Sequence, residues 1–250
     1  DWSGSGNWLD RVSSLAAAPV GDPAGSGDWI SLDGNDAFDV TAANNPATGA
    51  SNFTVFTKFK TTTGGVANNT GGSWWSNSGI VGGEVVGNPN DWGLMLLADG
   101  RGQGAFRGGS AQGSNVIDGN THTLALTWSG AGDDVGRVYI DGAFAGTTGA
   151  QDDGSGTIAN NGFAIGRNYV GGGSYYTGDV AAVQLHNSVE DARALHNQAT
   201  GYHPPLYERT VLADNPVVYY RLNEAPGSTG ARNIGSAGVQ IPQIETAEQA

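Results

Sequence analysis

Short runs of alternating apolar and polar residues, separated by turn signals, extend along most of the 250-residue chain. This pattern predicts an all-β fold with many short strands. Glycine, with 42 residues, is frequent enough to supply the turns that sandwiches and barrels require. The strands that we expect in the main body cover residues 29–32, 53–59, 92–97, 102–106, 121–128, 137–141, 143–147, 163–166 and 179–186.

Alternation in these strands predicts two antiparallel sheets with one core between them. Ala98-Asp99-Gly100-Arg101 and Asp141-Gly142 are tight-turn sequences and predict hairpins. The residues that we expect in the core are Phe53, Val55, Leu94, Leu96, Leu124, Leu126, Val138, Ile140, Ile165, Val183 and Leu185.

One short helix is predicted over residues 189–199. Ser188 is its expected N-cap, with the acidic residue Asp191 three positions later. The apolar residues on one face of this helix are Ala192, Leu195 and Ala199. The prolines of the following segment, 202–205, cannot continue a helix. We therefore predict a β-sandwich domain at residues 1–202 and a linker with a C-terminal tail at residues 203–250.

The tail contains one more strand pattern, between Pro216 and the turn signal Pro226-Gly227. Little that follows this strand in the sequence is suited to pair with it. The residues that we expect to take part in assembly are Val217, Val218, Tyr219, Tyr220, Arg221 and Leu222.

The charge composition narrows the choice of partners. Lys and Arg number 11 against 24 Asp and Glu, which gives a net charge of −13. This argues against nucleic acid and anionic membranes, since both bind basic surfaces. No apolar run reaches the ~20 residues of a membrane span, so no membrane insertion is expected. Cysteine is absent, which excludes disulfides, thiol catalysis and thiolate metal sites. Because the first residue is not methionine, we expect a processed form or an excised piece of a longer protein. The composition is typical of a bacterial protein that is secreted or held at the cell surface.

Several segments resemble laminin G-like domains of the concanavalin A-like lectin/glucanase superfamily, as found in bacterial extracellular tandem arrays. The resemblance covers residues 28–200 and implies an all-β, two-sheet antiparallel jelly-roll sandwich with one short C-terminal helix. It leaves function open, because this fold is used by lectins, adhesins, enzymes and spacer modules. The segments that carry it are SLDGNDAFDV (31–40), FTVFTKFKTT (53–62), WGLMLLADGR (92–101), DGNTHTLALTW (118–128), GRVYIDGAFAG (136–146), FAIGRN (163–168) and YYTGDVAAVQLHNSVEDARAL (175–195).

Two positions depart from the family pattern. Thr121 replaces the tryptophan that the family has before His122, a position where the resemblance implies a structural histidine. Ala181-Ala182 replaces an Asp-Glu pair whose first member often helps to hold a structural calcium in related sandwiches. The resemblance therefore gives no support to calcium at that position.

The tail at residues 211–236 resembles the beginning of such a domain, whereas the start of the chain resembles what normally follows it. Three explanations are open. The tail is a stump of the next module, it folds back onto its own sandwich, or it fills a vacant edge of a neighbouring copy. We favour the last, because an exposed sheet edge invites a strand from another chain. It predicts a structural or adhesive subunit that self-assembles by donating its C-terminal strand.

No enzymatic activity is expected. Glucanases of this fold use two glutamates that flank an aspartate on one strand, in the order E-x-D-x-x-E. None of the six glutamates of the chain fits this spacing. The four histidines are scattered and form no catalytic or metal-binding motif.

Two acidic loops are a candidate calcium site. Asp133 and Asp134 follow the strand that ends near Trp128, and Asp152 and Asp153 follow the meander. Because one hairpin turn intervenes, both loops are expected at the same end of the sandwich. Four carboxylates at one rim are suited to calcium. The alternative is that they are solvated turn residues.

Trp74 and Trp75 are the candidate ligand-binding residues, because adjacent tryptophans in a polar loop can stack on a sugar ring. In a strand, one of them would instead pack inwards and the other would lie at the surface. With the acidic loops, they predict an alternative function for the chain: a calcium-assisted carbohydrate-binding module, of lectin or adhesin type, from a larger surface protein.

Overall fold

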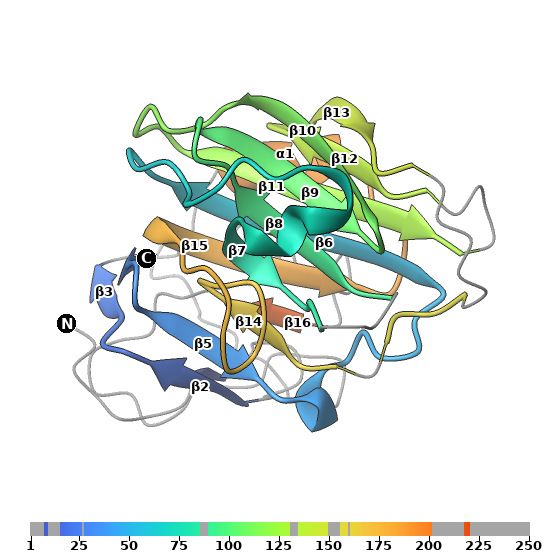
Figure 1. The fold of residues 1–250 in the computed structure, drawn as a ribbon, viewed down its shortest axis with the longest axis horizontal. Helices are drawn as coiled ribbons and strands as arrows, with labels where there is room; N and C mark the ends of the chain where they lie inside the picture. Colours follow the sequence, from blue (N-terminus) through green and yellow to red (C-terminus); the bar gives the residue numbers. More distant parts are fainter. Residues whose placement is uncertain are drawn as a thin grey trace, which may run out of the picture.

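The computed structural model describes residues 8–9, 16–26, 28–85, 90–130, 135–149, 156–159, 161–201 and 218–220. In these residues the chain forms two antiparallel sheets that pack face to face (Figure 1). The predicted all-β jelly-roll sandwich with one short helix is confirmed.

We call the sheet nearer the viewer in Figure 1 the front sheet. In spatial order it contains β1 (Trp8–Leu9), β2 (Ala16–Val20), β5 (Ala37–Val40), β14 (Phe163–Ile165), β7 (Ser78–Gly82), β8 (Trp92–Leu96), β9 (Arg101–Phe106) and β10 (Gly109–Asn115). The back sheet contains β13 (Ala143–Thr147), β12 (Arg137–Ile140), β11 (His122–Ser129), β6 (Asn52–Lys60), β15 (Thr177–His186), β4 (Trp29–Asp33) and β3 (Ala24–Ser26), and β16 (Val218–Tyr220) pairs with β15. The helical segments described are η1 (Ala42–Asn44), η2 (Gly71–Ser76) and α1 (Ala192–Thr200).

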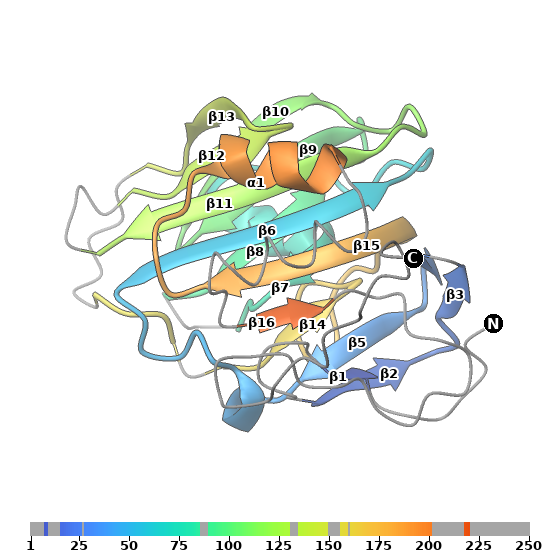
Figure 2. The same ribbon diagram turned by 180° about the vertical axis from the view of Figure 1, so that it is seen from behind.

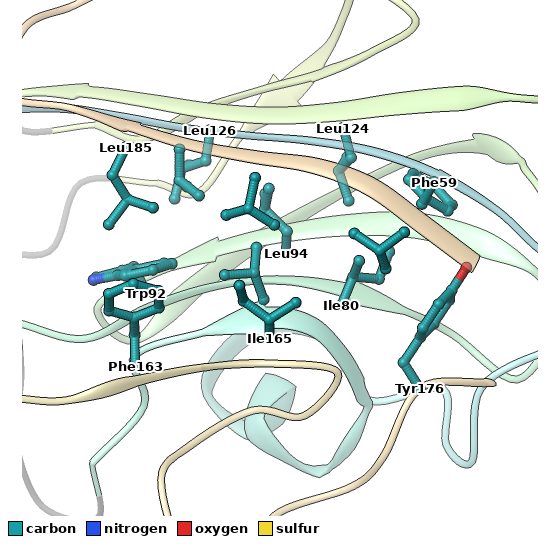
Figure 3. Packing of buried hydrophobic residues seen from close by; sticks show 14 of the residues in the cluster. Phe59, Ile80, Trp92, Leu94, Leu124, Leu126, Phe163, Ile165, Tyr176 and Leu185 are labelled. Carbon is teal, nitrogen blue, oxygen red and sulfur yellow. The ribbon is translucent and has the colours of Figure 1, made fainter. Parts of the chain in front are cut away.

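The core lies between the two sheets, where alternate residues of each strand point inwards. Figure 3 shows Leu124, Leu126 and Leu185 of the back sheet facing Trp92 and Leu94 of the front sheet. Each fully buried side chain of this size stabilises the fold by about 1.5–3 kcal/mol. The predicted core is confirmed, since every one of its residues is at most 5 % exposed.

The sequence pattern does not predict several of the strands, among them β2, β3, β7 and β10. These strands are rich in glycine, alanine and serine, so they lack a strong apolar alternation. Small residues are required where the sheets approach each other. A Cβ atom at Gly104 of the neighbouring strand β9, for example, would lie 2.6 Å from the side chain of Val138. Tertiary packing, rather than the local pattern, selects these strands.

The predicted N-cap of the helix, Ser188, is wrong. Asp191 is the N-cap, because its carboxylate accepts hydrogen bonds from the backbone N–H groups of Arg193 and Ala194. The preceding segment is held by β6: the Thr54 hydroxyl donates to the Ser188 carbonyl at 2.8 Å and accepts from the Glu190 N–H at 3.0 Å. The helix therefore begins only at Ala192.

Helix α1 covers the outer face of the back sheet (Figure 2). Its buried residues Ala192, Leu195 and Ala199 pack against three residues of that face, namely Phe56, Ala125 and Ala182. Ala182 belongs to the pair Ala181-Ala182, which stands where the laminin G-like pattern has Asp-Glu. Its small side chain is part of the apolar cluster beneath the helix. One outer face of the sandwich is thus occupied by a helix.

In the part of the chain that the structure describes, no helix combines the length and the apolar character of a membrane span.

Candidate functional site

The outer face of the front sheet is covered by the turn η2, which contains both predicted tryptophans (Figure 1). Trp74 is fully buried and packs on Met95 and Ala105 of the sheet. Its indole N–H donates a 2.9 Å hydrogen bond to the carbonyl oxygen of Arg107. A Cβ atom at Gly93 would lie 3.1 Å from the Trp74 ring, so glycine gives the ring its space. Trp74 therefore anchors η2 to the sheet.

Trp75 points to solvent and is 42 % exposed. Its ring lies edge-on to that of Trp74, with the centroids 6.3 Å apart and the planes at 73°. The side-chain amide of Asn168 donates a 2.8 Å hydrogen bond to its carbonyl oxygen. The same amide also donates to the carbonyl oxygen of Asn77. Of the two tryptophans, only Trp75 thus presents a ring to solvent, and it does so on a fixed backbone.

The loop between β14 and β15 lies beside η2. The Ser174 hydroxyl donates to the Ser76 carbonyl at 3.1 Å, and the Asn168 amide adds the bonds described above. Tyr169 lies against the loop's own backbone, because a Cβ atom at Gly172 would lie 2.7 Å from its ring. Tyr175 is half-buried and accepts a 2.8 Å hydrogen bond from the Arg167 guanidinium. Both tyrosines therefore belong to the loop whose Asn168 and Ser174 bind the backbone of η2.

Amide and hydroxyl groups continue this surface towards β10. The Asn77 amide donates to Gln103 Oε1 at 2.5 Å, and the Gln103 amide donates to the Ser110 hydroxyl at 3.0 Å. The Gln112 amide donates to the same hydroxyl at 3.2 Å. Gln103 is buried, whereas Ser110 and Gln112 are half-exposed. We call the solvent-reached residues of this surface, Trp75, Tyr169, Tyr175, Ser110 and Gln112, the Trp75 face.

The predicted calcium ligands Asp133, Asp134, Asp152 and Asp153 lie outside the described residues. The strands that flank their loops do reach one end of the back sheet, because Arg137 pairs with both Thr127 and Thr147. Of the predicted assembly residues, Val218, Tyr219 and Tyr220 form β16, whereas Val217, Arg221 and Leu222 lie outside the described residues.

Strand β16 pairs with β15 of its own chain. Val218, Tyr219 and Tyr220 lie opposite Leu185, Gln184 and Val183 in antiparallel register. The other half of the same edge of β15, residues 177–180, pairs with β4. β16 therefore completes an edge of β15 that β4 leaves uncovered, as the fold-back explanation expects.

A different acidic cluster is present among the described residues. Carboxylate oxygens of Asp22, Asp33 and Asp36 lie within 4.8 Å of one another. The buried Asp36 carboxylate accepts the backbone N–H groups of Asp22 at 2.7 Å and Asp33 at 3.0 Å. Burial raises the pKa of Asp36. These hydrogen bonds explain the cluster as the organiser of its turn, and we assign no metal to it.

His122 lies between two carboxylates, with Nδ1 2.8 Å from Asp141 and Nε2 3.0 Å from Asp118. Burial lowers the pKa of His122, but the hydrogen bonds to Asp141 and Asp118 outweigh it and the net shift is upward. Hydrogen bonds from Asn120 and then from His122 lower the pKa of Asp118 to about 2. These contacts tie the start of β11 to the β12–β13 turn, which is a structural role.

The two described glutamates give no support to a paired-carboxylate catalytic site. Glu84 follows β7 of the front sheet, is 3 % exposed, and has its pKa raised by burial. Glu190 precedes α1, on the side of the back sheet. Glycosidases need two carboxyl groups within about 5–9.5 Å across one substrate site.

No protein-family model and no curated protein matches the sequence. Solved structures do match. A sialidase of Trypanosoma rangeli, in complex with a difluoro sugar acid, has a TM-score of 0.56 at 17 % identity, over 78 % of this chain and 31 % of the sialidase. Botulinum neurotoxin type C, which depends on interaction with two ganglioside molecules to enter cells, has a TM-score of 0.52 at 11 % identity, over 76 % of this chain and 50 % of the toxin. The chain has the concanavalin A-like fold.

The mouse laminin α1 domains LG4-5 align with this concanavalin A-like domain at 12 % identity and a TM-score of 0.49, over 74 % of this chain and 46 % of the laminin chain. At identities this low, what the proteins share is the fold. The chain spans about a third of the sialidase and half of the toxin, so the activities of those whole proteins do not transfer to it.

The sequence pattern detects the tryptophan pair but not the rest of the Trp75 face. Asn168 and Gln103 are separated from Trp75 by long stretches of chain, and no local motif marks them. The FAIGRN segment, which ends on Asn168, is a sequence signal that points to this residue.

Proposed function

We propose that the chain is a non-catalytic carbohydrate-binding module of a secreted or cell-surface bacterial protein, and that it binds glycans through the Trp75 face. The observation that carries this proposal is the exposed indole of Trp75, fixed by the buried Trp74 beneath it and by Asn168 beside it.

The chemistry of the face suits a sugar. An indole ring offers a flat apolar surface to the C–H groups of a pyranose, while amides and hydroxyls hydrogen-bond to its OH groups. Ser110 and Gln112 offer such groups on β10. Because their side chains are already held by hydrogen bonds, little conformational entropy is lost when a ligand binds.

The comparisons support this class of function only through the fold. Two structures with this fold involve sialic-acid-type sugars or gangliosides, but one fold serves many functions. The proposal therefore rests on the residues of the Trp75 face. The shared fold makes a sugar the first ligand to test.

The experiment is a glycan array followed by isothermal titration with the best ligand. We expect Trp75→Ala to weaken binding by about tenfold or more, with an unchanged melting temperature. The matched control is Val189→Ala, because Val189 is 51 % exposed but lies between β15 and α1, away from the front sheet. Equal binding by Trp75→Ala and the native chain would remove the Trp75 face as the site.

Calcium assistance belongs to the same proposal on the basis of the sequence. Asp133, Asp134, Asp152 and Asp153 offer the oxygen ligands that calcium prefers. The strand residues on either side of these loops, Thr127, Arg137 and Thr147, lie next to one another in the back sheet, which supports the proposal of a shared site.

Self-assembly by strand donation is the second candidate. It requires β16 to pair with β15 of a neighbouring copy in the way that it pairs with its own. The described residues of β16 pair with an edge of β15 at three positions. The 16 residues from 202 to 217 can span up to about 50 Å when extended, so the same strand can reach a neighbouring copy. Exchange between copies would keep every β15–β16 contact while joining subunits.

A further inference from the structure

The basic residues of the front sheet are all engaged. Among the described residues this sheet and its loops contain three, Arg101, Arg107 and Arg167. The other described basic residues, on β6, β12 and α1, belong to the back sheet or to the helix that covers it. Whatever positive charge the described part of the Trp75 face offers must therefore come from these three arginines.

Arg167 is the basic residue closest in the chain to the Trp75 face, and its charge is paired with that of Asp39. Its Nε donates to Asp39 Oδ1 at 3.1 Å, and its Nη2 donates to the other oxygen of the same carboxylate. Its Nη1 donates to the Tyr175 hydroxyl at 2.8 Å. The side chain is only 4 % exposed. A bidentate pair of this kind leaves the guanidinium little capacity for a second carboxylate.

The other two arginines also have partners. Arg101 pairs with Asp99 at 2.8 Å at the surface, with its side chain 40 % exposed. Arg107 is 2 % exposed, and its guanidinium lies 5.1 Å from the ring centroids of both Phe106 and Trp128. The net charge of −13 adds a repulsive field for any anion that approaches.

An acidic sugar would need a basic side chain whose charge is not already paired. A sialic or uronic acid carries a carboxylate at neutral pH, and proteins bind such groups best with an uncommitted arginine or lysine. Burying that carboxylate without a basic partner is unfavourable. The amides, hydroxyls and aromatic rings of the Trp75 face match the uncharged OH groups and C–H faces of neutral sugars.

We propose that the Trp75 face selects neutral glycans and rejects sialylated or otherwise acidic ones. This inference rests on the proposed carbohydrate-binding function, and it separates this chain from the sialic-acid and ganglioside contexts of the structures that share its fold. Among the described residues, each arginine of the front sheet already has a partner, which disfavours acidic ligands, and the Ser110 and Gln112 side chains supply contacts for the neutral ones.

The test compares lactose-based and β-glucan oligosaccharides with sialyllactose, by isothermal titration of the full chain. We expect neutral oligosaccharides to bind at least about tenfold more tightly than sialyllactose. The ratio of the two affinities should become smaller with added salt, because salt screens the repulsion between the acidic chain and the carboxylate of sialyllactose. Sialyllactose binding as tightly as lactose, in a manner that depends on Trp75, would overturn the selectivity and leave the binding function standing. Loss of all glycan binding would instead overturn the function itself.

A charge variant makes the test sharper. Gln112→Arg adds a solvent-reached cation to the face, and Gln112→Glu is its matched control. We expect Gln112→Arg to raise the affinity for sialyllactose about tenfold, and Gln112→Glu to leave that affinity at or below the native level. Equal affinities of the two variants for sialyllactose would show that charge at this face does not set selectivity. Melting temperatures of both variants check that the sheet is intact.

Discussion

The side-chain amide of Asn168 donates a hydrogen bond to the carbonyl oxygen of Trp75 at 2.8 Å, so that one loop holds the exposed indole of another. The same amide serves the Asn77 carbonyl at the end of η2. The fully buried Asn168 therefore helps to fix the position of the ring, together with Trp74.

We expect Asn168→Ala to destabilise the chain by about 1–3 kcal/mol, because buried carbonyl groups lose their donor. Glycan binding should weaken as well, since the Trp75 ring is no longer fixed. Urea denaturation measures the first effect and titration the second. The control is Asn187→Ala, which removes an exposed hydrogen bond to Pro46 and should change stability by less than about 0.5 kcal/mol. Equal effects of the two substitutions would contradict the role of Asn168.

Trp74 is predicted to act on stability and Trp75 on binding. Trp74→Ala should cost about 3–5 kcal/mol, as expected for a buried tryptophan. Trp74→Phe keeps much of the packing but leaves the Arg107 carbonyl without its donor, at a cost of about 1–3 kcal/mol. Thermal and urea unfolding measure both variants, with Trp75→Phe as the control of similar size change. A Trp74→Phe protein as stable as the native chain would mean that the Arg107 bond contributes nothing.

His122 and His186 should make the stability of the fold depend on pH in opposite directions. The pKa of His122 in the folded chain lies above its ordinary value of 6.5, so its contribution is complete below pH 6.5 and is lost as pH rises through the raised value. Burial lowers the pKa of His186 to about 4, so its contribution is complete above pH 6.5 and is lost as pH falls towards 4.

Urea denaturation across pH 4.5 to 8, with the variants His122→Gln and His186→Gln, separates the two effects. We expect His186→Gln to flatten the loss of stability on the acid side, and His122→Gln to flatten the loss that begins above pH 6.5. Imidazole titrations by NMR report the two pKa values directly. A His186 signal that titrates at an ordinary value would contradict its burial.

If β16 exchanges between copies, the chain should sediment as oligomers at high concentration. Tyr219→Pro, which removes a backbone donor opposite Gln184, should then give monomers. Thr229→Pro, elsewhere in the tail, is the control and should sediment like the native chain. Analytical ultracentrifugation makes the measurement. A native chain that stays monomeric at all concentrations would restrict β16 to its own sandwich.

Calcium, if it binds at the acidic loops, should raise the melting temperature, and EDTA should reverse the change. The reason is mass action, because a ligand that binds only the folded chain stabilises it. The combined substitution of Asp133, Asp134, Asp152 and Asp153 by Asn should abolish the shift. The control variant Asp99→Asn alters an acidic turn outside these loops and should retain it. No shift in the native chain would end the calcium hypothesis.

The sequence predicts most strongly those parts of the fold where large apolar residues alternate. The strands around Val55 and Leu126 are examples, because each places every second side chain in the core. β10 is not predicted, because its glycines and serines show no apolar alternation. These small residues fit the close packing of the two sheets. The helix start is displaced from the prediction because Thr54, more than a hundred residues away, holds the Ser188 segment.

The candidate site is less predictable than the fold. Nothing local distinguishes Trp74 from Trp75, and their different exposures depend on Gly93, Met95 and Ala105 in other strands. The pairing of Arg167 with Asp39, on which the selectivity argument rests, joins residues 128 positions apart. Such partners emerge only when the sheet is assembled.

The pairing of β6 with β15 in the middle of the back sheet has a consequence for synthesis of the chain. Val55 lies opposite Leu185, so the second partner is translated long after the first. Until then, one edge of β6 has no strand to pair with and attracts other chains. Nascent chains of this protein should therefore depend on holding chaperones until β15 has been translated, and chains cut short before Thr177 should aggregate.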